Sequence, residues 1–130
     1  MGEWTREQLA SRSDEQVAAI ADRVLNRLCK WRSVFAGWQL GTRLDTDAEC
    51  RAVRDHREVT ILLRAEVNAL TKCLIDAGVI TSRSYTEALI LEVEHLDAAF
   101  AKKFPGTTAT DDGIAYDLPL AAETMRGWRP

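Results

Sequence analysis

Two seams of apolar residues, equal in length and close in sequence, constrain the fold of this chain more than any other feature. In the first, the steps alternate between four and three: Val17, Ala21, Val24, Leu28, Trp31, Phe35 and Trp38. In the second, they alternate between three and four: Val53, His56, Thr60, Leu63, Val67, Leu70 and Leu74. This heptad spacing keeps one face of a helix directed at a partner helix. We therefore predict two long helices, each with one apolar face.

The segment between the seams predicts a turn. Gly41 can end the first helix, and Asp45 or Asp47 can cap the second, within the polar stretch GTRLDTD. Because the turn is short and the seams match in length, we expect an antiparallel helical hairpin. In that pairing Trp38 lies near Val53, and Val17 lies near Leu74.

A third helix follows. Gly78 predicts a left-handed stop for the second helix, and Thr81 caps the third. Its apolar face is expected to be Tyr85, Leu89, Val93, Leu96, Phe100 and Phe104. Pro105 and Gly106 end it. Capping pairs, Thr5 with Gln8 and Ser13 with Gln16, also predict a short helix at about residues 6–12 before the first long one.

The predicted fold class is therefore all-α: a long antiparallel helical hairpin plus a third helix, with an irregular carboxyl-terminal arm. We assign residues 1–104 to the helical bundle and residues 105–130 to the arm, which packs on the bundle or on a partner. Pro119 can open one short helix in the arm, through about Met125. No stretch shows the alternation of a strand.

Composition limits the possible functions. The 130 residues suit one domain, and the net charge of −3 argues against a dedicated nucleic-acid coat. No apolar run reaches the length of a membrane span, so no membrane partner is expected. Cys29, Cys50 and Cys73 are an odd number with no close pair, which indicates reduced intracellular thiols.

Aromatic residues cluster in KWRSVFAGW, residues 30–38. Large aromatics on a seam are typical of a packed core, which is the interpretation we favour. The alternative is that an exposed Trp anchors a partner, because Trp is enriched at binding hot spots. The candidate partner-binding residues are Trp31, Phe35, Trp38, Trp128 and Arg129.

A basic stripe offers a second candidate surface. Phosphates of a nucleic acid could be bound by Arg23, Arg27, Lys30, Arg51 and Arg54. Acidic residues interleave with these cations, so a solvated charged face is the favoured interpretation, and we do not expect nucleic-acid binding to be the main role.

Signals for chemistry are weak. Glu92 and His95 have the Glu-x-x-His spacing of di-iron bundles, and His56 could lie at a similar height, but the second such pair is missing. No cysteine has a predicted base nearby. We expect no catalytic residues, no metal site and no cofactor.

The segments WRSVFAGWQLGTR, AVRDHREVTILLRAEVNALT, KFPG and AAETMRGWRP resemble small proteins of mycobacteriophages and related actinobacterial phages. The resemblance covers about residues 24–130 and brings no assigned activity. It implies a phage protein that acts in the bacterial host cytoplasm or is built into the virion.

Together these observations favour a non-enzymatic interaction protein that self-associates, for example as a homodimer, or binds a host or phage protein. The alternatives are a structural component of the virion and a weak nucleic-acid-binding protein.

Overall fold

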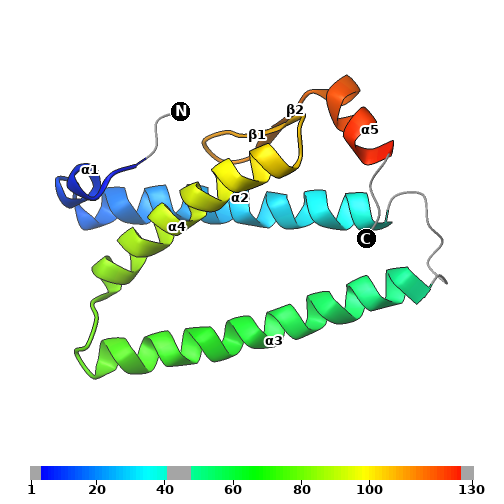
Figure 1. Ribbon diagram of the computed structural model, residues 1–130. Coiled ribbons are helices and arrows are strands. Elements are labelled where there is room, and N and C mark those ends of the chain that lie inside the picture. Colours follow the sequence, from blue (N-terminus) through cyan, green and yellow to red (C-terminus); the bar gives the residue numbers. More distant parts are fainter. Residues whose placement is uncertain (1–3, 41–47, 127–130) are drawn as a thin grey trace.

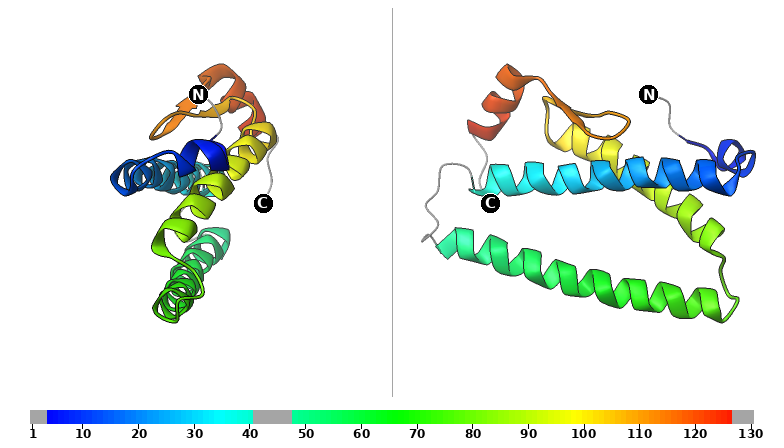
Figure 2. Two further views of the ribbon diagram at one scale, coloured as in Figure 1. Left: turned by 90° about the vertical axis from the view of Figure 1, so that its left-hand side faces the viewer. Right: turned by 180° about the vertical axis from the view of Figure 1, so that it is seen from behind.

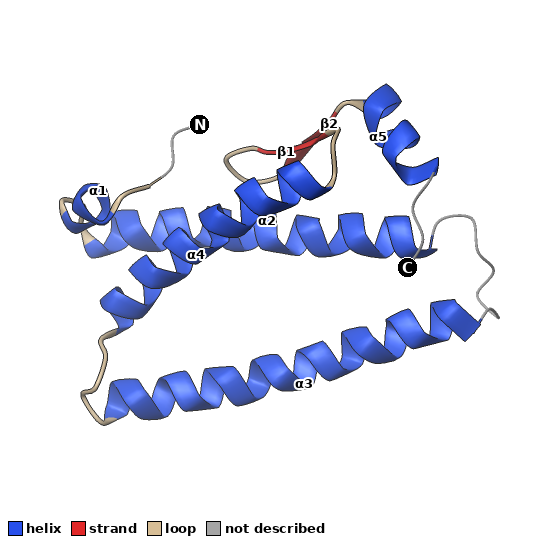
Figure 3. Cartoon of the chain, in the orientation of Figure 1, coloured by secondary structure: helices blue, strands red, loops and turns tan. Residues whose placement is uncertain are grey.

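The computed structural model describes residues 4–40 and 48–126, without the side chains of residues 32–40, 49 and 125. Helices dominate this part of the chain, and the all-α class is confirmed (Figures 1 and 3). The elements are α1 (Arg6–Ala10), α2 (Asp14–Leu40), α3 (Ala48–Asp76), α4 (Ser82–Lys103), β1 (Thr107–Ala109), β2 (Ile114–Tyr116) and α5 (Leu118–Arg126).

The helix starts follow the predicted capping chemistry. Thr5 caps α1, and its hydroxyl accepts a hydrogen bond from the Gln8 backbone N–H at 3.2 Å. Ser13 accepts the same bond from Gln16 at the start of α2, also at 3.2 Å. In both boxes the glutamine side chain accepts the backbone N–H of the cap in return. Thr81 caps α4, as expected. These local exchanges satisfy backbone N–H groups that have no partner within the helix.

The end of α3 is also as predicted. Gly78 has a φ of 72°, the left-handed conformation that glycine adopts without a Cβ penalty. The Val79 N–H donates to the Leu74 carbonyl at 3.0 Å, and the Gly78 N–H donates to the Ile75 carbonyl at 2.9 Å. This pair of bonds is a Schellman motif, and it stops α3 shortly before α4 begins.

The described side chains of the first seam, from Val17 to Trp31, are buried or half-buried, but mainly by a different helix from the one predicted. Among the described residues, the most extensive helix packing is between α2 and α4, which cross in Figure 1, while α3 contacts α2 less extensively. Val17 packs in a core with Ile90 and Val93 of α4 rather than near Leu74. The full set of buried residues in this core is Leu9, Val17, Ile20, Ala21, Val24, Ile90 and Val93.

A charged residue favours the packing of α2 on α4. Arg27 lies beside the first seam and is buried. In the predicted hairpin Arg27 would lie on the flank of the seam, where it could stay in contact with water. On α4, Arg27 instead meets the carboxylates of Glu94 and Asp97. A buried cation needs such partners, so the core forms with α4.

The buried face of α4 is rotated from the predicted one. Ile90, Val93 and Asp97 are buried, whereas Leu96 is exposed and Leu89 is only half-buried. The prediction assigned the face by apolar residues alone. Because the Asp97 carboxylate lies on the buried side, the buried face is turned by about one residue from the predicted face.

The arm contains a hairpin that we did not predict. β1 pairs antiparallel with β2, with Thr107 opposite Tyr116 and Ala109 opposite Ile114. The expectation of no strand is therefore wrong. Asp112–Gly113 is a hairpin-turn signal that the sequence contains. The strands were missed because each has only three residues, too few to show alternation. The short helix α5 follows, close to the segment predicted from Pro119.

Candidate functional site

Four polar side chains meet in the interior between α2 and α4. Asp97 accepts two hydrogen bonds, from the Arg27 Nε–H at 2.9 Å and from the Trp31 indole N–H at 2.7 Å. Glu94 lies on the other side of the guanidinium, with Oε1 3.7 Å from Arg27 Nη2. All four side chains are buried. We call Arg27, Trp31, Glu94 and Asp97 the polar cluster.

The polar cluster also contacts the start of the described chain and the hairpin that follows α4. Arg27 Nη1–H donates to the carbonyl of Asp111 in the hairpin turn at 2.9 Å. The Trp4 backbone N–H donates to the Glu94 carboxylate. One buried group of side chains therefore positions the hairpin and the residues before α1 on the α2–α4 pair.

This placement confirms the core interpretation for Trp31, and it removes Trp31 and Arg27 from the candidate binding surfaces. Trp31 is fully buried, packs at 5.3 Å from the Phe100 ring and donates to Asp97, so it belongs to the core and not to a partner surface. Arg27 is buried in the same cluster, so it cannot reach a phosphate. Both roles fail because a buried side chain with fixed internal partners cannot also bind an external ligand.

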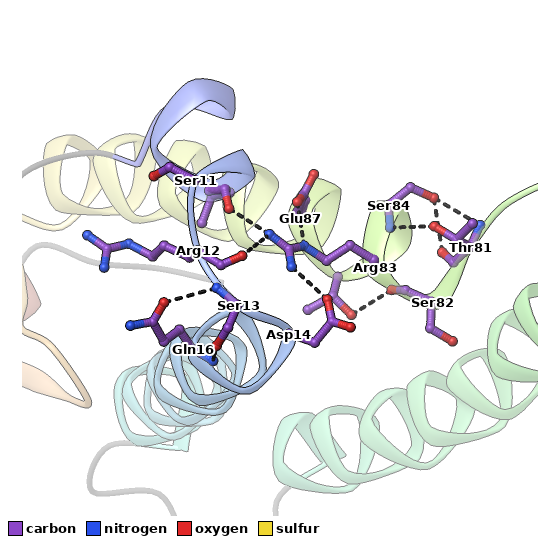
Figure 4. A network of polar contacts seen from close by, with 12 residues as sticks. Ser11, Arg12, Ser13, Asp14, Gln16, Thr81, Ser82, Arg83, Ser84 and Glu87 are labelled. Atoms are coloured by element: carbon purple, nitrogen blue, oxygen red, sulfur yellow. Dashed lines mark hydrogen bonds and ion pairs between the residues drawn. The ribbon is translucent and has the colours of Figure 1, made fainter.

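Arg83 forms a second polar centre, at the start of α4 (Figure 4). Its guanidinium donates to the carbonyls of Leu9 and Arg12 at 2.6 and 2.8 Å. It also pairs with Asp14 at 2.7 Å and with Glu87 at 2.6 Å. The hydrogen bond to Asp14, then that to Glu87, raises the pKa of Arg83 above its ordinary value. These bonds attach the α1–α2 connection to α4, which is a structural role.

The surface that stands out chemically is on α3. Figure 2 shows α3 apart from the α2–α4 pair along most of its length. Four apolar side chains on this helix keep about half of their surface exposed: Val59 at 60%, Leu63 at 57%, Val67 at 46% and Leu70 at 61%. We call these four residues the α3 stripe.

Helical geometry places the α3 stripe on one side of the helix. At about 100° per residue, its members fall within roughly 80° of one another. Ile61 is exposed at 58% but lies about 120° from Val67, the nearest member of the stripe, and about 160° from Leu63 and from Val59. Within the described chain, this is a continuous apolar surface on one helix, the kind that marks a protein-interaction site.

The other predicted partner residues lie outside the described side chains: Phe35, Trp38, Trp128 and Arg129. The remaining cations of the predicted basic stripe are exposed, but they are spread over α2 and α3: Arg23, Lys30, Arg51 and Arg54. Lys30 lines an open pocket beside the hairpin, together with Thr110, Asp112, Gly113, Ile114 and Tyr116. Without Arg27 these cations do not form the continuous stripe that the sequence pattern indicated.

Residues considered for chemistry are not brought together. His56 and His95 are exposed on different helices, and Cys50 is buried while Cys29 and Cys73 are exposed. Over residues 4–40 and 48–126, no group of three or more His, Cys, Asp and Glu side chains is placed to hold a metal ion. In the same part of the chain, no helix combines the length and apolar character needed to cross a membrane.

Sequence reasoning missed both the polar cluster and the exposure of the α3 stripe. A signal for the cluster was present, since Arg27 and Trp31 are four residues apart on α2 and Glu94 and Asp97 are three apart on α4. Such pairs share a helix face. No sequence signal marked the α3 stripe as uncovered, because a heptad seam reads the same whether its partner is in the chain or outside it.

Comparisons with known proteins add no relative. No protein-family model matches the chain, and no curated protein or solved structure matches it.

Proposed function

We propose that this chain is a non-enzymatic protein–protein interaction protein that binds an amphipathic helix along the α3 stripe. The observation that carries the proposal is the exposure of Val59, Leu63, Val67 and Leu70 on a helix whose neighbours, α2 and α4, cover each other. Monomeric proteins rarely leave a continuous apolar surface of this kind open to water.

Energetics support a covered α3. Full burial of an aliphatic side chain contributes about 1.5 to 3 kcal/mol, so covering the exposed half of four side chains is worth about 3 to 6 kcal/mol per chain. α3 is 29 residues long, and most helical stability in proteins comes from packing of an apolar face. A partner on the stripe would supply that packing.

The shape of the stripe supports a helix as the ligand. Its members follow one side of α3 in a line, and helices that pack along one another present apolar residues at the same steps of three and four. A partner helix with that spacing would place its own apolar residues between those of the stripe.

The resemblance to phage proteins leads us to propose the bacterial host cytoplasm as the place of action, with the virion as the alternative. Mass spectrometry of purified particles separates the two, because a virion component is recovered in a fixed ratio to the capsid protein. Absence from particles leaves the cytoplasm.

A matched pair of variants tests the interaction. Leu63→Lys places a charge in the stripe, and Ile61→Lys places the same charge on an equally exposed residue of the opposite side. The tagged chain and each variant are used to isolate complexes from the expressing cells, and each recovered protein is purified and recombined with the chain. We expect wild type and Ile61→Lys to bind the same helix-bearing protein and Leu63→Lys to lose it. Equal binding by all three, or no binding by wild type, contradicts the proposal.

A further inference from the structure

We propose that α3 is a separate and weaker unit of stability, which unfolds and refolds while α2, α4 and the elements attached to them stay folded. This makes α3 a conformational device, because the helix that carries the α3 stripe opens without a change in the core. The property belongs to the chain on its own, so its failure would leave the proposed function untouched.

The side chains of α3 are almost all in contact with water. Among those that the structure describes, Cys50 alone is buried. Every side chain from residue 61 to residue 70 is exposed. This stretch covers almost three turns at about 3.6 residues per turn, so all sides of the helix face solvent there. The half-buried side chains lie before and after it: Val53, Thr60, Thr71, Leu74 and Ile75.

α3 therefore lacks the packing on which helices in proteins depend. Most helical stability comes from the burial of an apolar face rather than from intrinsic propensity. α2 and α4 have such a face, because Val17 and Val24 share one buried core with Ile90 and Val93. None of the described α3 side chains is among the buried residues of that core. Regions with few buried apolar contacts open at the lowest free energy.

The other elements are attached to the α2–α4 pair by contacts that do not involve α3. Arg27 holds the hairpin through the Asp111 carbonyl, and Glu94 accepts the backbone N–H of Trp4 before α1. Arg83 attaches the α1–α2 connection to α4. These contacts can persist when α3 opens.

The junction between α3 and α4 permits this opening. The Thr81 N–H donates to the Ser84 hydroxyl and the Ser84 N–H donates to the Thr81 hydroxyl, both at 3.0 Å, so α4 is capped by its own residues. At Gly78 a Cβ would meet nothing within 4 Å, so the space beside this turn is open. The start of α4 therefore does not depend on a folded α3.

Native-state amide hydrogen exchange, followed by NMR at one protein concentration, tests the inference. In wild type we expect α3 amides to exchange at least about tenfold faster than the core amides of α2 and α4. A matched pair of variants then perturbs each unit. Ala65 in α3 and Ala88 in α4 are both exposed and inside their helices, and glycine at either position weakens the helix by about fivefold in its folding equilibrium.

The two variants distinguish a separate unit from a single cooperative one. Ala88→Gly should speed exchange in α2 and α4 about fivefold and leave α3 unchanged, because α4 stays folded when α3 opens. Ala65→Gly should speed the exchange of α3 about fivefold. If Ala88→Gly speeds α3 as much as α2 and α4, the helices unfold together and the inference is overturned. Unchanged α3 exchange in Ala65→Gly overturns it as well.

Discussion

Replacing Asp97 with asparagine tests whether the polar cluster holds α2 and α4 together. The carboxylate uses one oxygen for the Trp31 indole N–H, at 2.7 Å, and the other for the Arg27 Nε–H, at 2.9 Å. Asparagine keeps the shape but offers one acceptor oxygen, and its amide N–H₂ then faces one of the two donors. One donor loses its acceptor, and the buried guanidinium loses its nearer negative charge.

The expected cost is large compared with the stability of a domain. Removing one member of a buried ion pair costs about 3 to 5 kcal/mol. Because asparagine still accepts one hydrogen bond and Glu94 remains 3.7 Å from the guanidinium, we expect a loss near the lower limit, about 3 kcal/mol. With a urea dependence of about 2 kcal/mol per molar, the unfolding midpoint falls by about 1.5 M.

Urea unfolding followed by circular dichroism measures this loss, at one protein concentration so that self-association contributes equally to each variant. The control is Glu92→Gln, which removes a carboxylate from an exposed position of the same helix and should change the free energy of unfolding by less than about 0.5 kcal/mol.

A double-mutant cycle with Arg27→Met isolates the pair. Once Arg27 is gone, the asparagine that replaces Asp97 can give its single oxygen to the Trp31 indole N–H. The double variant should therefore be less destabilised than the sum of the single ones by about 1 to 3 kcal/mol. If Asp97→Asn is as stable as Glu92→Gln, or if the two substitutions are additive, the polar cluster does not stabilise the α2–α4 pair and the reasoning is refuted.

Two further predictions concern the connections between elements. Gly78 and Gly106 both have positive φ, of 72° and 92°, but a Cβ at Gly106 would lie 2.5 Å from the backbone nitrogen of Ala121 while one at Gly78 meets nothing within 4 Å. Gly78→Ala should therefore cost about 1 to 2 kcal/mol in urea unfolding, and Gly106→Ala at least about 1 kcal/mol more; equal costs would show that the α5 contact is unimportant. Arg83→Met removes the donors to the Leu9 and Arg12 carbonyls, so hydrogen exchange of the α1 amides should become faster while that of the α3 amides is unchanged, and unchanged α1 exchange would contradict the role of Arg83.

Local features of this fold could be predicted from the sequence because their causes are local. The caps at Thr5, Ser13 and Thr81 and the stop at Gly78 each depend on hydrogen bonds within a few residues. The hairpin at Asp112–Gly113 is of the same local kind, and its turn signal could have been found. Its strands were missed because three residues are too few to show alternation.

The packing could not be predicted in the same way, because a periodic pattern names the face of a helix and not its neighbour. The seam of α2 fits either α3 or α4 by apolar residues alone. Asp97 also hid the buried face of α4, since a carboxylate at a core position reads as surface until its partners Arg27 and Trp31 are known. The α3 stripe was missed for the same reason. Because α2 packs mainly on α4, the apolar side chains of the stripe remain exposed.

The polar cluster and the open α3 stripe have a common cause. If Arg27 were apolar, the seams of α2 and α3 could pair as the heptads indicate, and both would be covered within one chain. A buried guanidinium favours α4 as the partner of α2, because α4 offers Asp97 and Glu94 on its buried side. Replacing a whole buried ion pair by apolar residues often leaves stability unchanged, whereas removing one partner is costly. By committing α2 to α4, Arg27 leaves the apolar side of α3 available to another molecule, and a side chain in the core thereby determines which surface of this protein can bind a partner.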